Sequence, residues 1–472
     1  MSPSSPPPPT AATPVFTRAL GPREALSLVV GRIIGSGIFR TPGPIMALTL
    51  TPGPFFAVWL IAGAMTMLSA LCYAELVAML PRSGGPYAYL VEAYPPWWAF
   101  LRGWAMFFVS ETASIAAVAL VFAQYAAVMW GAAGGAAWPR GLETALAVAG
   151  VWLFTWVNVR GVQAGGRVQN VLTVLKLGAL VAVAVVGLAL ARAAGPALPP
   201  RWGQGEGAGP VTEFWKTVLA VGAAMRYAFF AFSGWEGATY VAEEVREPER
   251  NLPRSILWGI GIVLGAYLLA NAAYLRQLGP AGMAGSKQVA ADAMRAALGP
   301  GGALLIALAV VLSTAGNINA QVMVKARTWH AMARDGLFPR RLGIVDVKHR
   351  TPLGALVGQA LWASALLVAA GLAGRAYETV IDYFSFTSAV FNLSTFVAVL
   401  VLRRRRPDLE RPFKTPWVPV VPLLGILISL LLMLSLPVGT WLRLIVWLVI
   451  GVVIYFGYSR HHSRVQSELG GR

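Results

Sequence analysis

The chain has 472 residues, of which 57% are hydrophobic and only 12% are charged, and its formal net charge is +18 at pH 7. The charged fraction is about half the roughly 25% of soluble domains, and apolar runs long enough to cross a roughly 30 Å hydrocarbon layer recur along the chain. This pattern predicts a polytopic α-helical membrane protein. It excludes a soluble enzyme, a β-barrel and a collagen-like fibre.

The ends of the chain and its positive charge fit the same class. Residues 1–20 are rich in Pro and Ser, lack the apolar core of a cleavable signal, and are expected to form a disordered cytoplasmic tail. Residues 459–472 are expected to form a second tail. The net positive charge is attributed to cytoplasmic loops rather than to a nucleic-acid partner, because Lys and Arg accumulate there in membrane proteins.

Hydropathy predicts twelve transmembrane helices. An even number of spans places both termini on one side. Lys and Arg are concentrated in the tails and in the connections that follow spans 2, 4, 6, 8 and 10, which makes that side cytoplasmic. The predicted spans are 24–48, 54–80, 97–128, 142–160, 168–192, 215–243, 255–276, 301–330, 353–372, 379–402, 418–437 and 440–458.

Glycines interrupt two of these spans. The first reads VVGRIIGSGIFRTPG, with Gly35 and Gly37 on either side of Ser36, and the sixth reads RYAFFAFSGWEGATYVAEE, with Ser233 and Gly234 at its centre. Each glycine weakens a helix by about 1 kcal/mol relative to alanine. Spans one and six correspond if spans 1–5 and 6–10 are repeats, and paired interruptions of this kind are typical of the binding site of a transporter. The alternative is that these glycines serve helix packing.

An interrupted helix in a bilayer offers both donors and acceptors to a ligand. The half-helix that begins near Gly37 presents free N–H groups and a positive dipole end to an anion. The carbonyl groups freed near Ile33 and near Phe232 and Ser233 suit a cation. A zwitterionic amino acid needs both kinds of group, so it is the ligand that the pattern predicts.

Six blocks in order resemble the amino acid–polyamine–organocation superfamily, and specifically its L-type amino-acid transporter branch. They are GRIIGSGIFRTPG, PRSGGPYAYL, NVRGVQAGGRVQNVLTVLKL, FSGWEGATYVAEEVREPERNLPRSI, ARDGLFPRRL and LRRRRPDLERPFK, and their spacing covers most of the chain. The resemblance implies a LeuT-like 5+5 inverted repeat with discontinuous helices 1 and 6. Residues 21–192 would form the first five-helix repeat, 215–402 the second, and 403–458 transmembrane helices 11 and 12.

The resemblance also implies a set of substrate-binding residues. Backbone contacts to the amino acid are expected from the first and sixth spans, with a gating aromatic side chain that closes over the substrate. The positions that match are Ile33, Ser36, Gly37, the aromatic Phe230, Ser233 and Gly234. In the tenth span, Ser388 and Ala389 stand where members that carry large neutral amino acids tend to have bulkier groups.

Charged residues within the spans are candidates for coupling or gating, because such residues are costly in a bilayer. The resemblance places Lys176 where sodium-independent relatives put an ammonium in the space of a sodium ion; the alternative is a lysine that snorkels to the interface. Glu236 resembles the acid of cationic-substrate exchangers and could instead cap exposed backbone donors. Glu111 is expected to pair with Arg32 or Arg226.

Polar side chains of the eighth span have two interpretations. Asn317, Asn319 and Gln321 could face the substrate pocket or make helix–helix contacts.

Several chemistries have no signature in the sequence. The four histidines form no HExxH or Cys/His metal pattern, and no GxxxxGK[ST] loop is present, so neither an enzyme, a metal site nor a cofactor is expected. Cys72 is the only cysteine, which excludes an intramolecular disulfide. Residues 129–141 contain no cysteine, where relatives that bond covalently to a heavy subunit have one, so no disulfide-linked heavy subunit is expected.

These observations predict a sodium-independent secondary transporter of amino acids in the inner or plasma membrane. It would work by alternating access, through exchange or proton coupling, with neutral amino acids as the first expectation. The alternatives are an antiporter of cationic amino acids or amines that uses Glu236 as counter-charge, a channel, and an amino-acid sensor that does not transport.

Overall fold

The structure is a computed structural model, and it describes residues 18–132, 134–139, 141–190, 210–286, 288–373, 377–434 and 438–459. Within these ranges the chain is helical, and extended pairing is confined to two isolated bridges, Leu20 with Val245 and Asp346 with Thr351. The predicted all-α class is confirmed. The expected tails lie, apart from residues 18–20 and 459, outside the described residues.

The helices of the first half of the chain often begin with proline, whose fixed φ and missing N–H suit the first position of a helix. They are α1 (Pro22–Ile33), α2 (Gly37–Arg40), α3 (Pro42–Thr49), α4 (Pro52–Met79), α5 (Pro86–Ala93), α6 (Pro96–Ala105), the π-helical turn η1 (Met106–Ser110), α7 (Glu111–Ala132), α8 (Leu142–Val159) and α9 (Val162–Ala189).

The second half of the chain is helical as well. Its elements are α10 (Pro210–Phe232), the 3₁₀ helix η2 (Trp235–Glu244), α11 (Pro248–Gly285), α12 (Val289–Leu298), α13 (Pro300–Arg334), the 3₁₀ turn η3 (Arg340–Gly343), α14 (Leu353–Ala373), α15 (Tyr377–Arg405), α16 (Val420–Leu434), α17 (Val438–Ile454) and the π-helical turn η4 (Tyr455–Ser459).

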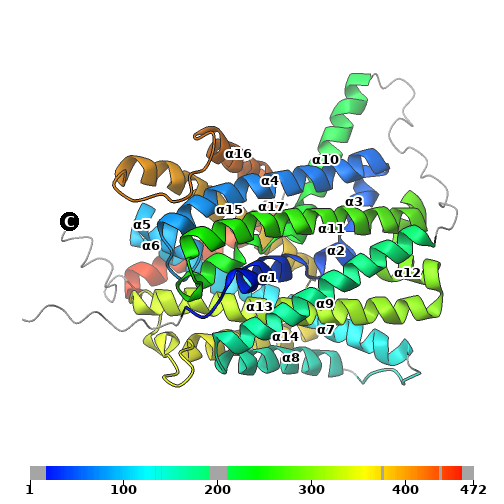
Figure 1. Ribbon diagram of the computed structural model, residues 1–472, viewed down its shortest axis with the longest axis horizontal. Helices are drawn as coiled ribbons and strands as arrows, with labels where there is room; N and C mark the ends of the chain where they lie inside the picture. Colours follow the sequence, from blue (N-terminus) through cyan, green and yellow to red (C-terminus); the bar gives the residue numbers. More distant parts are fainter. Residues whose placement is uncertain are drawn as a thin grey trace, which may run out of the picture.

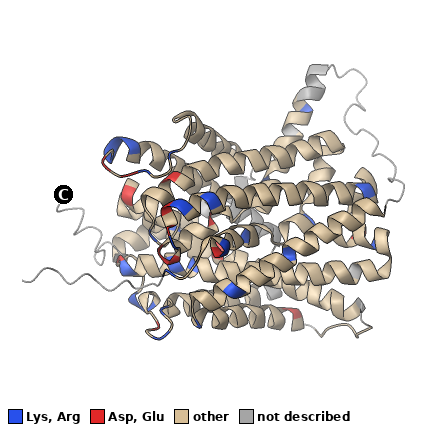
Figure 2. Cartoon of the chain, in the orientation of Figure 1, with Lys and Arg blue, Asp and Glu red and all other residues tan. Residues whose placement is uncertain are grey.

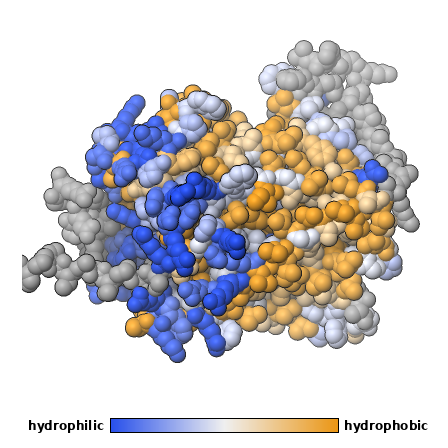
Figure 3. Space-filling view, in the orientation of Figure 1, coloured by the Kyte–Doolittle hydropathy of each residue, from blue (hydrophilic) through white to orange (hydrophobic). Residues whose placement is uncertain are grey.

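The surface of the helical body is that of a membrane protein. Eight helical segments among the described residues are long and apolar enough to cross a bilayer, and three shorter apolar helices accompany them. The long helices run along one direction (Figure 1), and Figure 3 shows a broad hydrophobic surface over them. Lys and Arg gather mostly at the end near the C-terminus (Figure 2). The chain is therefore a multi-pass membrane protein.

Both predicted interruptions are present in the structure. α1 ends at Ile33, the backbone of Ile34 is extended, and α2 starts only at Gly37. α10 ends at Phe232, and the chain continues after Gly234 as the tighter helix η2. Gly234 has φ of 95°, and a Cβ there would lie 2.7 Å from Cγ of Arg32, so both the conformation and the space require glycine.

The seventh span extends well beyond its predicted boundaries. It was expected over 255–276 and is part of α11, which continues to Gly285 through a non-helical Gly279. The short helix α12 follows, with Val289 and Met294 buried. Hydropathy identified the span but could not show what its ends pack against.

Candidate functional site

The two interrupted helices enclose a pocket of about 370 Å³, here called the head-group pocket. All six predicted substrate-binding residues line it, which brings together positions from the first and sixth spans. The lining also includes residues from α7 and α13. Its full set is Arg32, Ile33, Gly35, Ser36, Gly37, Ser114, Val118, Phe230, Ala231, Ser233, Gly234, Asn317 and Gln321.

The pocket offers backbone donors at the start of α2. Gly37 and Ile38 occupy the first turn of that helix, where N–H groups have no acceptor within the helix. Thr41, between α2 and α3, has helical φ and ψ, so the segment continues as a nearly unbroken helix to Thr49. A Cβ on Gly37 would lie 2.7 Å from Cα of Ala231, so only glycine lets the two broken helices approach this closely.

Several carbonyl groups released by the break accept hydrogen bonds from side chains. The Tyr267 hydroxyl, from α11, lies 3.0 Å from the Ile33 carbonyl oxygen and 3.0 Å from that of Ala231. Nδ2 of Asn317 donates to the Arg32 carbonyl oxygen at 2.8 Å. The Ile33 carbonyl, expected to be free for a ligand, therefore already has one partner and retains one lone pair.

Lys176 is fully buried and reaches the same break from α9. Its Nζ donates to the carbonyl oxygens of Gly31 at 2.7 Å, Ile34 at 3.0 Å and Ser313 at 2.9 Å. Two of these oxygens belong to the end of α1 and one to α13. The ammonium is thus held by backbone oxygens inside the protein, and its side chain does not extend to the interface.

A buried cluster of charges lies beside the head-group pocket. Nη2 of Arg32 is 3.0 Å from the Glu111 carboxylate, and Nζ of Lys325 contacts the same carboxylate. Lys325 also donates to the Glu111 carbonyl oxygen at 2.9 Å. Of the two partners expected for Glu111, Arg32 is the one in contact, whereas Arg226 donates to the Tyr227 hydroxyl at 3.0 Å.

Sequence reasoning missed Lys325. The residue stands near the end of the predicted span 301–330, where a lysine is ordinarily interfacial, and only the extension of α13 to Arg334 places it within the buried part.

The two asparagines of α13 have different surroundings. Asn317 lines the head-group pocket, as one interpretation expected. Asn319 donates to the Gly165 carbonyl oxygen at 3.2 Å and to Oε1 of Gln169 at 2.9 Å, so it makes the helix–helix contact of the other interpretation.

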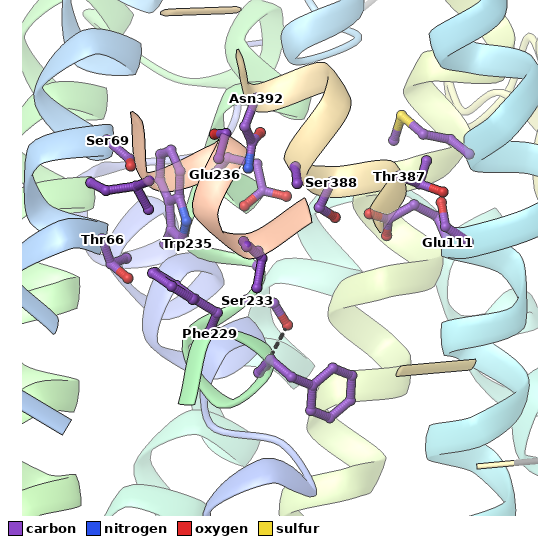
Figure 4. Close-up of a pocket in the computed structure, with 18 of the residues that line it drawn as sticks. Thr66, Ser69, Glu111, Phe229, Ser233, Trp235, Glu236, Thr387, Ser388 and Asn392 are labelled. Atoms are coloured by element: carbon purple, nitrogen blue, oxygen red, sulfur yellow. Dashed lines mark hydrogen bonds between the residues drawn. The ribbon is translucent and has the colours of Figure 1, made fainter. Parts of the chain in front are cut away.

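A second, larger cavity of about 820 Å³ adjoins the first, and it is here called the side chamber. Phe230, Ser233 and Gly234 line both cavities. Figure 4 shows the side chamber surrounded by side chains from α4, from η2 and from α15, with Trp235 and Glu236 contributed by η2. The Glu236 carboxylate lies 4.0 Å from Nη2 of Arg32, so this acid faces the buried cluster as well as the cavity.

The chain matches the model of the family described as amino acid permease over residues 20–458. It belongs to the amino acid permease family. Its relatives place it within the amino acid–polyamine–organocation superfamily, in the L-type branch that the sequence blocks resemble. It is therefore not an enzyme.

Three relatives are informative. The b(0,+)-type amino acid transporter 1 of Homo sapiens is 32% identical over 451 residues, which cover 94% of this chain and 88% of that protein. Asc-type amino acid transporter 1 of Mus musculus is 33% identical over 409 residues, 86% of this chain and 74% of that one. Large neutral amino acids transporter small subunit 2 of Mus musculus is 32% identical over 443 residues, which cover 93% of this chain and 80% of that protein.

The permease ties η2 to α13 by a second buried ion pair. Nε and Nη2 of Arg327 donate to the two carboxylate oxygens of Glu244 at 2.7 and 3.1 Å, and both side chains are fully buried. This bidentate arrangement fixes the end of the second interrupted helix against a long, continuous one.

Replacing Arg327 by Met should strongly destabilise the permease, because it leaves the Glu244 carboxylate buried and unpaired, at a cost of about 3–5 kcal/mol. Thermal unfolding of the purified protein in detergent measures the effect. Arg334→Gln is the matched control, since that arginine is 45% exposed and its contact with Glu243 is 3.7 Å long. Equal melting temperatures for R327M and R334Q would contradict the structural role assigned to the pair.

Proposed function

We propose that the protein is a sodium-independent secondary transporter of amino acids, with neutral amino acids preferred, that works by alternating access. The observation that carries the proposal is the pocket enclosed by two interrupted helices. Unwound backbone is tolerated in a bilayer only where it lines a protein-enclosed cavity, and here the unwound segments line such a pocket.

The fine architecture is part of this proposal. We infer twelve transmembrane helices arranged as two inverted repeats, 21–192 and 215–402, followed by two helices in 403–458, with both termini cytoplasmic in the inner or plasma membrane. The support is the matching position of the two breaks, in α1–α2 and in α10–η2, and the gathering of Lys and Arg at one end of the helices.

The substrate would bind through its two head groups. Its carboxylate would accept hydrogen bonds from the backbone near Ser36 and Gly37, and its ammonium would contact the remaining lone pair of Ile33 and the unwound backbone at Ser233 and Gly234. Phe230, which lines both cavities, would close over it as a gate. The glycines let the substrate approach the main chain closely.

Lys176 supports the sodium-independent part of the proposal. Its ammonium occupies a set of three backbone carbonyl oxygens, the kind of ligand that a hard cation such as sodium would need. A second cation at the same oxygens would be repelled by the first. The protein therefore carries its own cation at this position.

The surroundings of Glu236 favour neutral over cationic substrates. A cationic side chain in the side chamber would meet the Arg102 guanidinium, which also lines that chamber. Glu236 as counter-charge is already shared with Arg32 at 4.0 Å. The cationic antiporter remains the second candidate.

Uptake into proteoliposomes tests the function. Radiolabelled neutral amino acids should enter vesicles preloaded with unlabelled amino acid, and external sodium should not change the rate. Uptake into empty vesicles driven by an inward proton gradient would instead indicate symport. Entry of lysine or arginine but not of neutral amino acids would replace the proposal with the cationic antiporter, and binding without flux would indicate a sensor.

Lys176→Met should reduce counterflow at least tenfold, because the carbonyl oxygens of Gly31, Ile34 and Ser313 lose their donor and the end of α1 is no longer linked to α13. Initial rates of exchange in proteoliposomes measure this. Lys348→Met, on an exposed loop, is the control and should exchange at the wild-type rate. A K176M protein with wild-type exchange would remove Lys176 from the mechanism.

Gly37→Ala should weaken substrate binding at least tenfold, since the new methyl group collides with the backbone of Ala231 and separates the two interrupted helices. Gly178→Ala on α9 is the matched control, because no neighbouring atom of the described part of the chain lies within 4 Å of a Cβ there. Substrate-dependent thermal stabilisation measures the affinity of both proteins. Unchanged stabilisation of G37A would place the substrate elsewhere.

A further inference from the structure

Many polar side chains line the side chamber beside apolar ones, although the chamber lies within the helical body of a membrane protein. Hydroxyl, amide and charged side chains from α4, α6, η1, α7, η2, α15 and α16 face it. The residues that line it are Thr66, Ser69, Arg102, Met106, Ser110, Glu111, Phe229, Phe230, Ser233, Gly234, Trp235, Glu236, Thr387, Ser388, Ala389, Asn392, Phe396, Ile428, Ser429 and Leu432. Polar surface of this kind needs a partner, either water or a ligand.

One charged group of the chamber lacks the counter-charge that buried cations usually have. Arg102 is 5% exposed, and among the described residues no carboxylate lies within 4.0 Å of its guanidinium. Its Nε is buried and has no hydrogen-bond partner among the described residues. The guanidinium carbon lies 5.6 Å from the ring centroid of Phe391, and Tyr240 and Glu236 are further neighbours. Arg102 thus lines the chamber without a carboxylate in direct contact.

Glu236 is an acid that lacks a hydrogen-bond donor among the described residues. Its carboxylate accepts no hydrogen bond from the part of the chain that the structure describes, and its nearest cation is Arg32 at 4.0 Å. Glu111, the other acid of the chamber, is already satisfied by Arg32 and Lys325. The chamber thus contains one cation, Arg102, with no carboxylate within 4.0 Å among the described residues, and one acid, Glu236, whose only close cation there is Arg32 at 4.0 Å.

Several of the remaining polar side chains of the wall already make hydrogen bonds within the protein. Thr66, Ser69, Ser233 and Ser429 donate their hydroxyl protons to carbonyl oxygens of their own segments, at 2.7, 2.9, 2.7 and 3.0 Å. They can therefore only accept hydrogen bonds from a ligand. Oδ1 of Asn392 accepts a hydrogen bond from Tyr73 at 2.6 Å, which leaves the amide N–H groups of Asn392 for another acceptor.

We propose that the side chamber holds the substrate's side chain and selects amino acids with a terminal carboxamide. Arg102 would donate to the carboxamide oxygen, and Glu236 would accept from its nitrogen. The inference rests on the proposed function, because the wall of Phe230, Ser233 and Gly234 shared with the head-group pocket is what directs the side chain into the chamber.

Other side chains fit this pair of groups less well. An apolar side chain would strip water from Arg102 and Glu236 without replacing its hydrogen bonds, and sites built around polar partners reject analogues that lack them. A carboxylate side chain would satisfy Arg102 but face Glu236, and an ammonium would do the reverse. Only a dipolar group satisfies both residues at once.

Competition against exchange of radiolabelled glutamine tests the proposal. Half-inhibitory concentrations are compared for glutamine, glutamate and methionine, which have side chains of similar length. In the wild type, glutamine should compete at least tenfold better than methionine. In Arg102→Met this preference should fall below threefold. In Glu236→Gln, the half-inhibitory concentration of glutamate should fall at least tenfold relative to that of glutamine. The reason is that the new amide donates a hydrogen bond to the glutamate carboxylate instead of repelling it.

The controls separate this inference from the proposed function. Arg167→Met, on an exposed position of α9 that lines neither cavity, should keep the wild-type ratios. If R102M is not recovered folded, the change of preference in E236Q still decides. Exchange of amino acids without any preference for glutamine, or with ratios unchanged in both variants, would overturn the inference alone. Absence of exchange for every amino acid would overturn the proposed function.

Discussion

The structure depends on one constraint, that main-chain polar groups exposed inside a bilayer must find partners within the protein. The breaks after Ile33 and Phe232 release such groups in the middle of the helical body. Tyr267 lies within hydrogen-bond distance of a carbonyl oxygen on each broken helix, and Lys176 links α1 to α13. These side chains make the interruptions stable while leaving the donors at the start of α2 for a ligand.

The buried charges connect the same elements. The Glu111 carboxylate joins α7 to α1 through Arg32 and to α13 through Lys325, and Arg327 joins α13 to η2 through Glu244. Each interrupted helix is thereby attached to the long helix α13. A rearrangement that opens the site to either side must keep these pairs together or exchange their partners, since a lone buried charge is costly. The network thus limits which helices can move independently.

The sequence predicted the helices and the breaks well, and the reason is local. Glycines within apolar runs indicate local interruptions of the helical backbone, so the breaks at Gly37 and Gly234 could be predicted without a structure. Contacts between residues far apart in the sequence could not be predicted in this way. Tyr267 looks like an ordinary apolar-span residue, and Arg102, in the Trp-rich start of its span, resembles an interfacial arginine. Only the packed structure shows that Tyr267 bridges the two breaks and that Arg102 faces a cavity.

The ammonium of Lys176 is attached to the polypeptide by its own side chain, and this has a thermodynamic consequence. An ion that binds from solution and leaves on the other side carries the free energy of its concentration gradient into the transport cycle. A cation that never leaves the protein does no such work, however well it stabilises the backbone carbonyls around it. In the sodium-independent cycle that we propose, uphill movement of substrate draws on a gradient of another solute, either a second amino acid or protons.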